Sequence, residues 1–213
     1  MRFLCDMLHP EPKSIDDLLP QIGVHEKHSV RISFPQGCTF GIARAYLYDI
    51  HYAGRPYEED IELASFEGCD WYERITNSLH SHCSTLNVKK RKKNTQLFIL
   101  TELDSILLYP LAEVLLNVLV HGNKKDLTKS IELNYYLGEK GIALVVTDQG
   151  TGFPVAETIE KYERGEYYYH GLGKGFLALG EPWLHTYYNE TGNQCIIVYD
   201  FSHKEAFKPR KRI

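Results

Sequence analysis

Apolar residues follow strand-like and helix-like spacings in the N-terminal half of the chain. Apolar and polar residues alternate over residues 28–34, which predicts a half-buried strand. Over residues 40–50 the apolar positions recur at the spacing of a helix face. A second helix is predicted within residues 59–82. Residues 1–27 predict an irregular or helical lead-in, because prolines and charged residues interrupt their short apolar pieces.

A longer apolar helix is predicted over residues 102–121. Its apolar side chains cover one broad face, which is typical of a buried amphipathic helix. Pro110 must start or kink this helix, because proline lacks the backbone N–H that a helix interior uses. Gly122 and Asn123 then supply the helix stop.

Three β-rich runs lie beyond this helix. Residues 131–137 and 142–147 are separated by a short segment that begins and ends with glycine, so they predict an antiparallel hairpin. A third run, residues 194–201, follows turn-forming residues and predicts another strand. The C-terminal half is therefore predicted to combine a long helix with strands.

The composition narrows the class of protein. A chain of 213 residues that is 43% hydrophobic is expected to be a packed globular protein. Its net charge of -4 gives no reason to expect nucleic acid as a ligand. The five cysteines are scattered without a Cys-x-x-Cys pair, so we expect no disulfide framework and no zinc site, and a cytoplasmic setting fits best. Without a long apolar stretch near the N-terminus, neither a signal peptide nor a membrane span is expected.

Glu113, Asn117 and His121 form a polar stripe on the predicted long helix. Residues four apart lie on neighbouring positions of one helix face, so these side chains project from the same side of an otherwise apolar helix. A carboxylate and a carboxamide in a partly buried site can be satisfied by hydrated Mg²⁺ and its phosphates, because Mg²⁺ takes oxygen ligands. The alternative is a solvent-facing helix edge, with His121 near the negative end of the helix dipole.

Two glycine-rich segments carry the remaining candidate chemistry. In residues 145–153 a β-rich run ends at Asp148, and glycines then occupy alternate positions. Such a carboxylate can accept a hydrogen bond from an exocyclic amine such as that of adenine; an ordinary turn with a polar aspartate is the alternative. Residues 170–175 (HGLGKG) precede a predicted helix, so their backbone N–H groups can bind phosphate, with Lys174 as an additional cation.

The order of these three elements resembles the Bergerat-type superfamily of gyrase, heat-shock chaperone, histidine kinase and mismatch-repair ATPases. Residues 113–121 (EVLLNVLVH) resemble its N box, residues 148–152 (DQGTG) its first glycine box and residues 171–175 (GLGKG) its second. Residues 117–133, followed by DQGTGF, look most like the anti-sigma-factor serine kinase branch. The likeness covers about residues 97–201. It implies an α+β fold, a two-layer sandwich in which helices cover one face of a mixed, mostly antiparallel sheet.

Carried over residue by residue, the resemblance implies a site for ATP and Mg²⁺. Asn117 would ligate Mg²⁺, Glu113 would act as the catalytic residue that polarises the attacking water or hydroxyl, and Asp148 would read adenine. Residues 153–170 would form a mobile lid. The other residues that the resemblance places around the nucleotide are His121, Gly150, Gly152, Gly171, Leu172, Gly173, Lys174 and Gly175.

The resemblance also implies a domain plan and a function. Residues 28–201 would form the ATP-binding domain, with an insertion at about 54–100 and a basic tail at 202–213. We expect a kinase that phosphorylates a serine or threonine of a regulatory partner of the sigma-factor or anti-anti-sigma kind, and by resemblance a homodimer. One alternative is a catalytically silent, nucleotide-sensing module that sequesters such a partner. Another is a histidine kinase remnant with a phospho-accepting His80 or His82.

Overall fold

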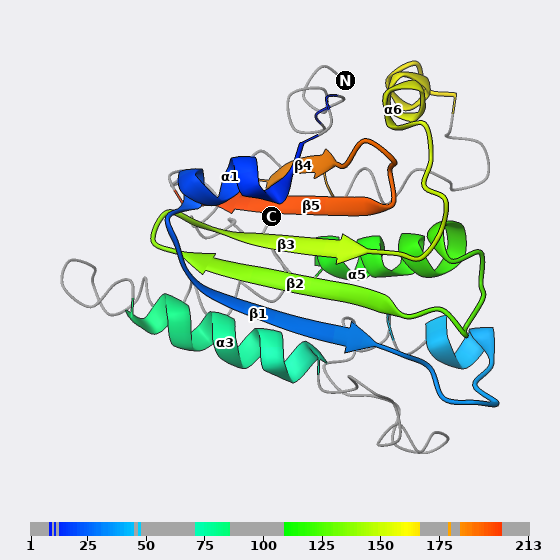
Figure 1. Cartoon of the computed structure of the whole chain (residues 1–213), viewed down its shortest axis with the longest axis horizontal. Coiled ribbons are helices and arrows are strands. Elements are labelled where there is room, and N and C mark those ends of the chain that lie inside the picture. Colours follow the sequence, from blue (N-terminus) through cyan, green and yellow to red (C-terminus); the bar gives the residue numbers. More distant parts are fainter. Residues whose placement is uncertain are drawn as a thin grey trace, which may run out of the picture.

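The fold is built on a five-stranded antiparallel sheet (Figure 1). The computed structural model describes residues 9, 11, 13–44, 47, 71–85, 109–166, 179 and 184–201. The strands are β1 (Val24–Ile32), β2 (Ile131–Gly138), β3 (Gly141–Thr147), β4 (Leu184–Tyr188) and β5 (Gln194–Asp200), in the order β1-β2-β3-β5-β4. Every pairing among these described strands is antiparallel, so the parallel component of the expected mixed sheet is not found there.

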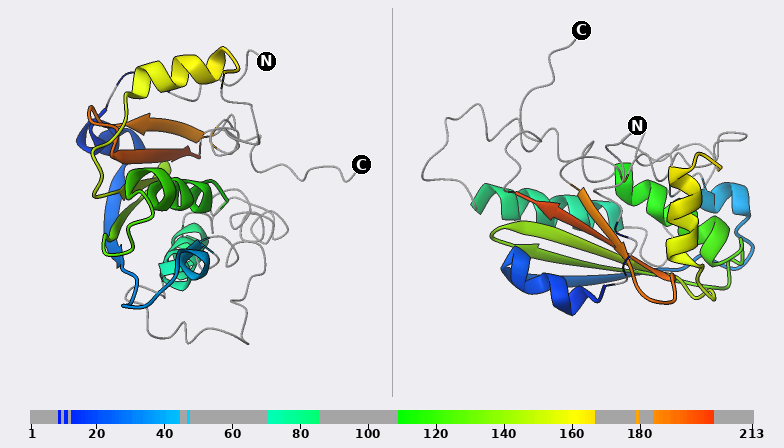
Figure 2. Two further views of the ribbon diagram at one scale, coloured as in Figure 1. Left: turned by 90° about the vertical axis from the view of Figure 1, so that its right-hand side faces the viewer. Right: turned by 90° about the horizontal axis from the view of Figure 1, so that it is seen from above.

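Helices lie on both faces of the sheet (Figure 2). They are α1 (Ile15–Ile22), α3 (Trp71–Thr85), α5 (Tyr109–Asn117) with its π-helical extension η3 (Val118–Gly122), and α6 (Val155–Glu163); residues 40–44 are also helical. We call the face toward α3 and α5 the inner face and the face toward α1 the outer face. The resemblance predicts helices on one face of the sheet only. This prediction is wrong, because α1 packs on β2 and β3 from the outer side.

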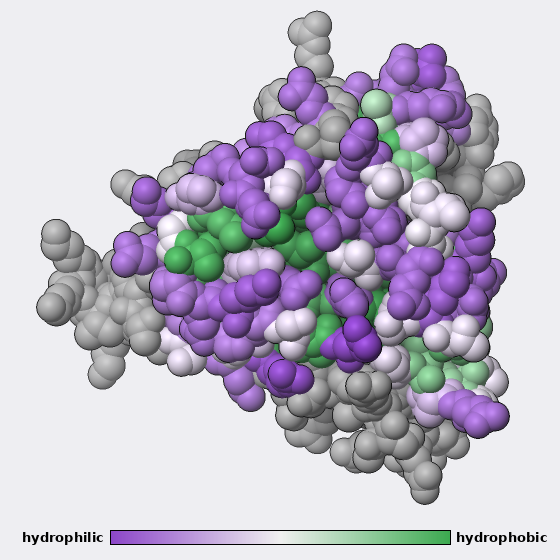
Figure 3. Space-filling model, viewed as in Figure 1, coloured by the Kyte–Doolittle hydropathy of each residue, from purple (hydrophilic) through white to green (hydrophobic). Residues whose placement is uncertain are grey.

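The sheet buries apolar side chains on each face because successive strand residues point to opposite sides. Leu133, Leu144 and Ile197 belong to the larger inner core with the buried side of α5. Ala143 and Val145 belong to the smaller outer core, which α1 covers. Figure 3 shows apolar residues near the middle of the outer face, with polar residues around them. The molecule is thus an α+β protein with two cores of unequal size.

Helix α1 is well specified at both ends. The hydroxyl of Ser14 accepts a hydrogen bond from the Asp16 N–H at 3.3 Å, and the Ser14 N–H donates to the Asp17 carboxylate at 3.2 Å. This reciprocal arrangement satisfies backbone N–H groups that the first turn leaves unpaired. Gly23 ends the helix at a φ of 64°, a backbone conformation that favours glycine. The predicted lead-in is therefore partly a capped helix, and β1 begins at Val24 rather than at residue 28.

Most of the strand and helix predictions in the C-terminal half are confirmed. The hairpin is β2 and β3, and β5 covers the third β-rich run. Helix α5 and η3 confirm the predicted long helix over residues 109–121, and the first part of that prediction, residues 102–108, lies outside the described ranges. Strand β4 and helix α6 were not predicted. No helix in the described ranges is long and apolar enough to cross a membrane.

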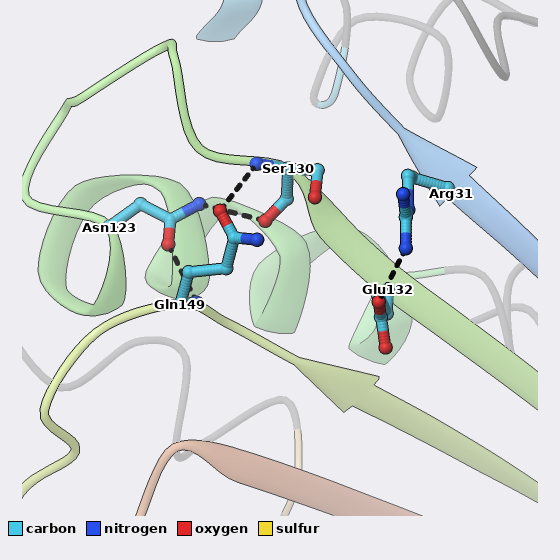
Figure 4. Close-up of polar contacts among 5 residues, drawn as sticks. All are labelled: Arg31, Asn123, Ser130, Glu132 and Gln149. Atoms are coloured by element: carbon cyan, nitrogen blue, oxygen red, sulfur yellow. Dashed lines mark hydrogen bonds and ion pairs between the residues drawn. The ribbon is translucent and has the colours of Figure 1, made fainter.

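The outer face becomes polar toward the ends of β2 and β3 that lie nearest the candidate site. Arg31 and Glu132 form an exposed ion pair at 3.0 Å across β1 and β2 (Figure 4). Thr147 accepts a hydrogen bond from Gln194 at 3.1 Å across β3 and β5. These residues are register partners in one row across the sheet. The side chains of Arg31 and Glu132 are exposed, and Thr147 and Gln194 are partly exposed, so the row lies at the solvent surface, where an ion pair contributes little to stability.

Candidate functional site

Helix α5 carries the predicted polar stripe from the core toward the surface. Residues 110–115 are buried, and Glu113 lies among them with 8% of its surface exposed. Asn117, the last residue of α5, is partly exposed, and His121 in η3 is exposed. A buried carboxylate needs polar partners, so Glu113 is a specific feature of this apolar helix. The three side chains therefore follow a gradient from buried to exposed.

The helix changes from α to π geometry directly after Asn117. Within η3, the Asn123 N–H donates to the carbonyl of Val118 at 2.7 Å, a π-type bond. A π-turn holds more residues than an α-turn, so His121 does not repeat the angular step that relates Asn117 to Glu113. The shared helix face predicted from α-helical spacing applies to Glu113 and Asn117, which both belong to α5.

Asp148 lies where β3 ends, as its position after a β-rich run predicts. It is 8% exposed, and its Oδ1 accepts a hydrogen bond from the Gly150 N–H at 2.7 Å. Its own backbone N–H donates to the carbonyl of Asn193 at 3.0 Å. Burial raises the pKa of Asp148, and the Gly150 N–H and the charge of Lys129 oppose that rise. The structure therefore holds a partly desolvated carboxylate at the end of a central strand.

The end of the long helix touches Asp148 through glycine. A Cβ built at Gly122 would stand 2.3 Å from Asp148 Oδ2, and one at Gly150 would stand 2.1 Å from the Gly122 carbonyl oxygen. Side chains at these positions would overlap their neighbours, so the close approach depends on glycine. The N-box-like helix and the first glycine segment are thus in direct contact at Gly122, Asp148 and Gly150.

Gly152 contacts the turn between β4 and β5. Its φ is 75°, and a Cβ there would lie 1.7 Å from the Thr191 carbonyl oxygen. The next residue, Phe153, donates its N–H to the same carbonyl at 3.1 Å. A Cβ at Gly192 would lie 2.4 Å from the Phe153 carbonyl oxygen, and Gly192 also has a positive φ. The second glycine after Asp148 therefore serves a backbone-to-backbone contact in this structure.

Asn123 joins three backbone segments at the site, and sequence reasoning assigned it only a helix stop (Figure 4). It is fully buried. Its Oδ1 accepts the Gln149 N–H at 3.0 Å, and its Nδ2 donates to the carbonyls of Ser130 at 3.3 Å and Lys129 at 3.5 Å. The Gln149 side chain accepts the Ser130 N–H at 3.1 Å. The signals in the sequence were a polar residue directly after the apolar helix and the run HGN (residues 121–123) within the segment that resembles anti-sigma-factor kinases.

Several predicted site residues lie outside the described part of the chain. These are Gly171, Leu172, Gly173, Lys174 and Gly175 of the second glycine segment, and residues 167–170 of the predicted lid. The earlier part of that lid contains α6, which packs into the inner core through Val155, Ile159 and Tyr162. Of the predicted insertion at 54–100, the structure describes α3.

His82 of α3 is buried and bonded to the backbone of β2. It is 4% exposed, and its Nε2 lies 2.9 Å from the carbonyl oxygen of Gly138, to which it donates. Burial lowers the pKa of His82, and the nearby His25 adds to this effect. A buried nitrogen that is already bonded to the backbone is a poor phospho-acceptor, so the histidine kinase interpretation finds no support at His82. The side chain of His80 lies outside the description.

The described ranges contain no cluster of His, Cys, Asp and Glu that could hold a metal by itself. Among the predicted metal-site residues, the carboxylate of Glu113 and the carboxamide of Asn117 are one helical turn apart. Such oxygen donors suit Mg²⁺ when phosphate and water supply the remaining ligands.

No family model matches the sequence, and no curated protein matches it either.

Proposed function

We propose that this protein binds ATP and Mg²⁺ in a Bergerat-type domain and transfers the γ-phosphate to a serine or threonine of a regulatory partner protein. The observation that carries the proposal is the contact between Gly122 and Asp148. It brings a desolvated carboxylate to the end of the helix that bears Glu113 and Asn117. The resemblance assigns these residues to adenine recognition, metal binding and proton transfer. They therefore lie on two elements that contact each other.

Asp148 suits recognition of an exocyclic amine. In the part of the chain that the structure describes, the Gly150 N–H is the hydrogen-bond donor to this carboxylate. An ionised carboxylate can accept further hydrogen bonds, so acceptor capacity remains at Asp148. Recognition of an amine by such a buried group is selective, because an analogue without the amine leaves the carboxylate unpaired.

Glu113 and Asn117 suit the phosphate end of the nucleotide. When bound, Mg²⁺ supplies charge neutralisation to the phosphates, which is the main requirement of phosphoryl transfer. Asn117 is the residue that would hold the metal through its side-chain oxygen. Glu113, one turn earlier and buried, would accept the proton of the attacking hydroxyl while the surrounding apolar residues exclude water.

Calorimetry with Mg²⁺–ATP tests the proposal on the full chain. We expect binding by the wild type, about tenfold weaker binding by Asn117→Ala, and retained binding by Glu113→Ala. Asn134→Ala is a matched control because Asn134 lies on the outer face of β2, in register with Ser29. Failure of the wild type to bind Mg²⁺–ATP would overturn the proposal.

Phosphate transfer is tested separately with labelled ATP and proteins that co-purify with the chain. Transfer by the wild type and its loss in Glu113→Ala, by a factor of about 10² or more, would support a kinase. Binding without any transfer would instead support the catalytically silent, nucleotide-sensing module. The two measurements therefore separate the nucleotide site from the chemistry performed there.

A further inference from the structure

The side chain of Asn123 makes hydrogen bonds to backbone groups that are distant in the sequence. Its Oδ1 accepts the Gln149 N–H, and its Nδ2 donates to the carbonyls of Ser130 and Lys129. It is fully buried, and its removal would leave these backbone groups without their side-chain partner. The helix stop itself uses the Asn123 backbone N–H and does not need this side chain.

These bonds constrain Asp148 from two sides. Gln149, which Asn123 binds, is the residue after Asp148, and Gly122, which lies against the Asp148 carboxylate, is the residue before Asn123. Asn123 therefore closes a short loop of contacts between the helix end and the strand end. Figure 4 shows its side chain between the entry of β2 and the segment that follows β3.

We infer that Asn123 is a positioning residue that holds Asp148 where it can recognise the exocyclic amine of a 6-aminopurine nucleotide. This inference rests on the proposed function. Asn123 does not itself contact the base. It acts through its two neighbours in this contact. Asn123 holds the backbone of Gln149, which follows Asp148, and it directly follows Gly122, which lies against the Asp148 carboxylate.

The test compares ATP with purine riboside 5′-triphosphate, which lacks the exocyclic amine, each with Mg²⁺. The wild type should prefer ATP by about tenfold or more, since the amine donates to an ionised group. Asn123→Ala should lose most of that preference: its affinity for ATP should fall, and its affinity for the analogue should change less than about twofold. Equal losses for both nucleotides would indicate a merely structural role and overturn the inference.

A second variant keeps the test decisive if Asn123→Ala does not fold. Asn123→Ser shortens the side chain, so it withdraws the acceptor from the Gln149 N–H and the donor from the Ser130 carbonyl while a polar group stays in the buried position. We expect a folded protein by circular dichroism and a loss of the preference for ATP. An unchanged preference in folded Asn123→Ser would overturn the inference. Asn134→Ala should keep the wild-type preference.

The outcomes for the wild type separate this inference from the proposed function. Absence of Mg²⁺–ATP binding contradicts the proposed function and the inference together. Equal binding of ATP and the analogue by the wild type leaves nucleotide binding in place and overturns the inference, because Asp148 would then not read the amine. A wild-type preference that survives Asn123→Ala also overturns it.

Discussion

Gly122 stands directly against the carboxylate of Asp148. A Cβ at position 122 would lie 2.3 Å from Oδ2 and 2.9 Å from the Cβ of Asp148. Atoms that are not bonded to each other do not approach so closely in a packed protein. The helix end and the strand end therefore meet at a residue without a side chain. This contact fixes where the desolvated carboxylate sits relative to Asn117 and Glu113.

Gly122→Ala should displace Asp148 and weaken Mg²⁺–ATP binding about tenfold or more, since the added methyl group overlaps the carboxylate. The overlap should also lower the free energy of unfolding by about 1–3 kcal/mol, which denaturant titration measures. The control is Gly41→Ala, because the nearest atom to its Cβ would be Thr39 Oγ1 at 3.9 Å. That variant should keep its affinity. Wild-type affinity and stability in Gly122→Ala would contradict the contact.

Asp148→Asn should stabilise the protein at neutral pH and weaken nucleotide binding. Burial raises the pKa of Asp148, so the folded state binds a proton more tightly than the unfolded chain, and this contribution is lost as the pH rises through the raised pKa. The ionised carboxylate therefore costs stability at pH 7. Asparagine removes that cost and still offers an acceptor to the Gly150 N–H.

Melting curves of the wild type and Asp148→Asn at several pH values measure this effect. The variant should melt at a higher temperature at pH 7, and the difference should shrink as the pH falls toward the ordinary aspartate pKa of 3.8. Its affinity for Mg²⁺–ATP should fall about tenfold or more, because the amide is a weaker acceptor than the carboxylate. A lower melting temperature at pH 7 would show that the carboxylate is satisfied in the folded protein.

The parts of the fold that the sequence predicted are those with a local cause. The β2–β3 hairpin follows from β-rich runs on either side of a glycine-bounded turn, and α5 follows from the apolar spacing within residues 102–121. Strand β4 was not predicted because Tyr187 and Tyr188 place large side chains on both faces of the sheet, so apolar and polar residues do not alternate there. Helix α6 was not predicted because its residues were assigned to the lid.

The site was predictable in part for the same reason. Asp148 was placed correctly at a strand end because a β-rich run precedes it directly in the sequence. The role of Asn123 depends on where β2 begins and where β3 ends, and these segments meet only in the folded sheet. The π-turn after Asn117 likewise has no local signature, since the apolar spacing of Val118 and Leu119 also suits an α-helix.

His82 should make the stability of the protein depend on pH. Its folded pKa is lowered by burial and by His25, while the Gly138 carbonyl and Glu26 oppose the shift. A lowered histidine pKa stabilises the neutral folded state above the unfolded value of 6.5, and this stability is lost as the pH falls through the folded pKa. The free energy of unfolding should therefore decrease from pH 7 toward pH 5, as measured by denaturant titration.

His82→Gln should flatten that dependence, because glutamine can still donate to Gly138 but does not titrate. The pKa of His9 is also lowered by burial, so some dependence should remain in the variant. His28→Gln serves as the control, since His28 is partly exposed beside Glu26. An unchanged pH profile in His82→Gln would show that protonation of His82 does not oppose folding.

Cys195 should react with a thiol reagent only when the sheet opens. Burial raises the pKa of its thiol to about 12, and it lies in β5 in register with Val146 of β3. At pH 8 the reactive thiolate is therefore almost absent in the native state. Cys38 is partly exposed, so alkylation followed by peptide mapping should find Cys38 labelled before Cys195.

The same labelling rate reports nucleotide binding, because a ligand that binds only the folded state suppresses opening by the factor 1 + [L]/Kd. Mg²⁺–ATP at about a hundred times its Kd should slow the labelling of Cys195 about a hundredfold if it reacts through global unfolding. Asp148→Asn should show much weaker protection at the same concentration. Labelling of Cys195 as fast as that of Cys38 without nucleotide would mean that β5 is not stably paired between β3 and β4.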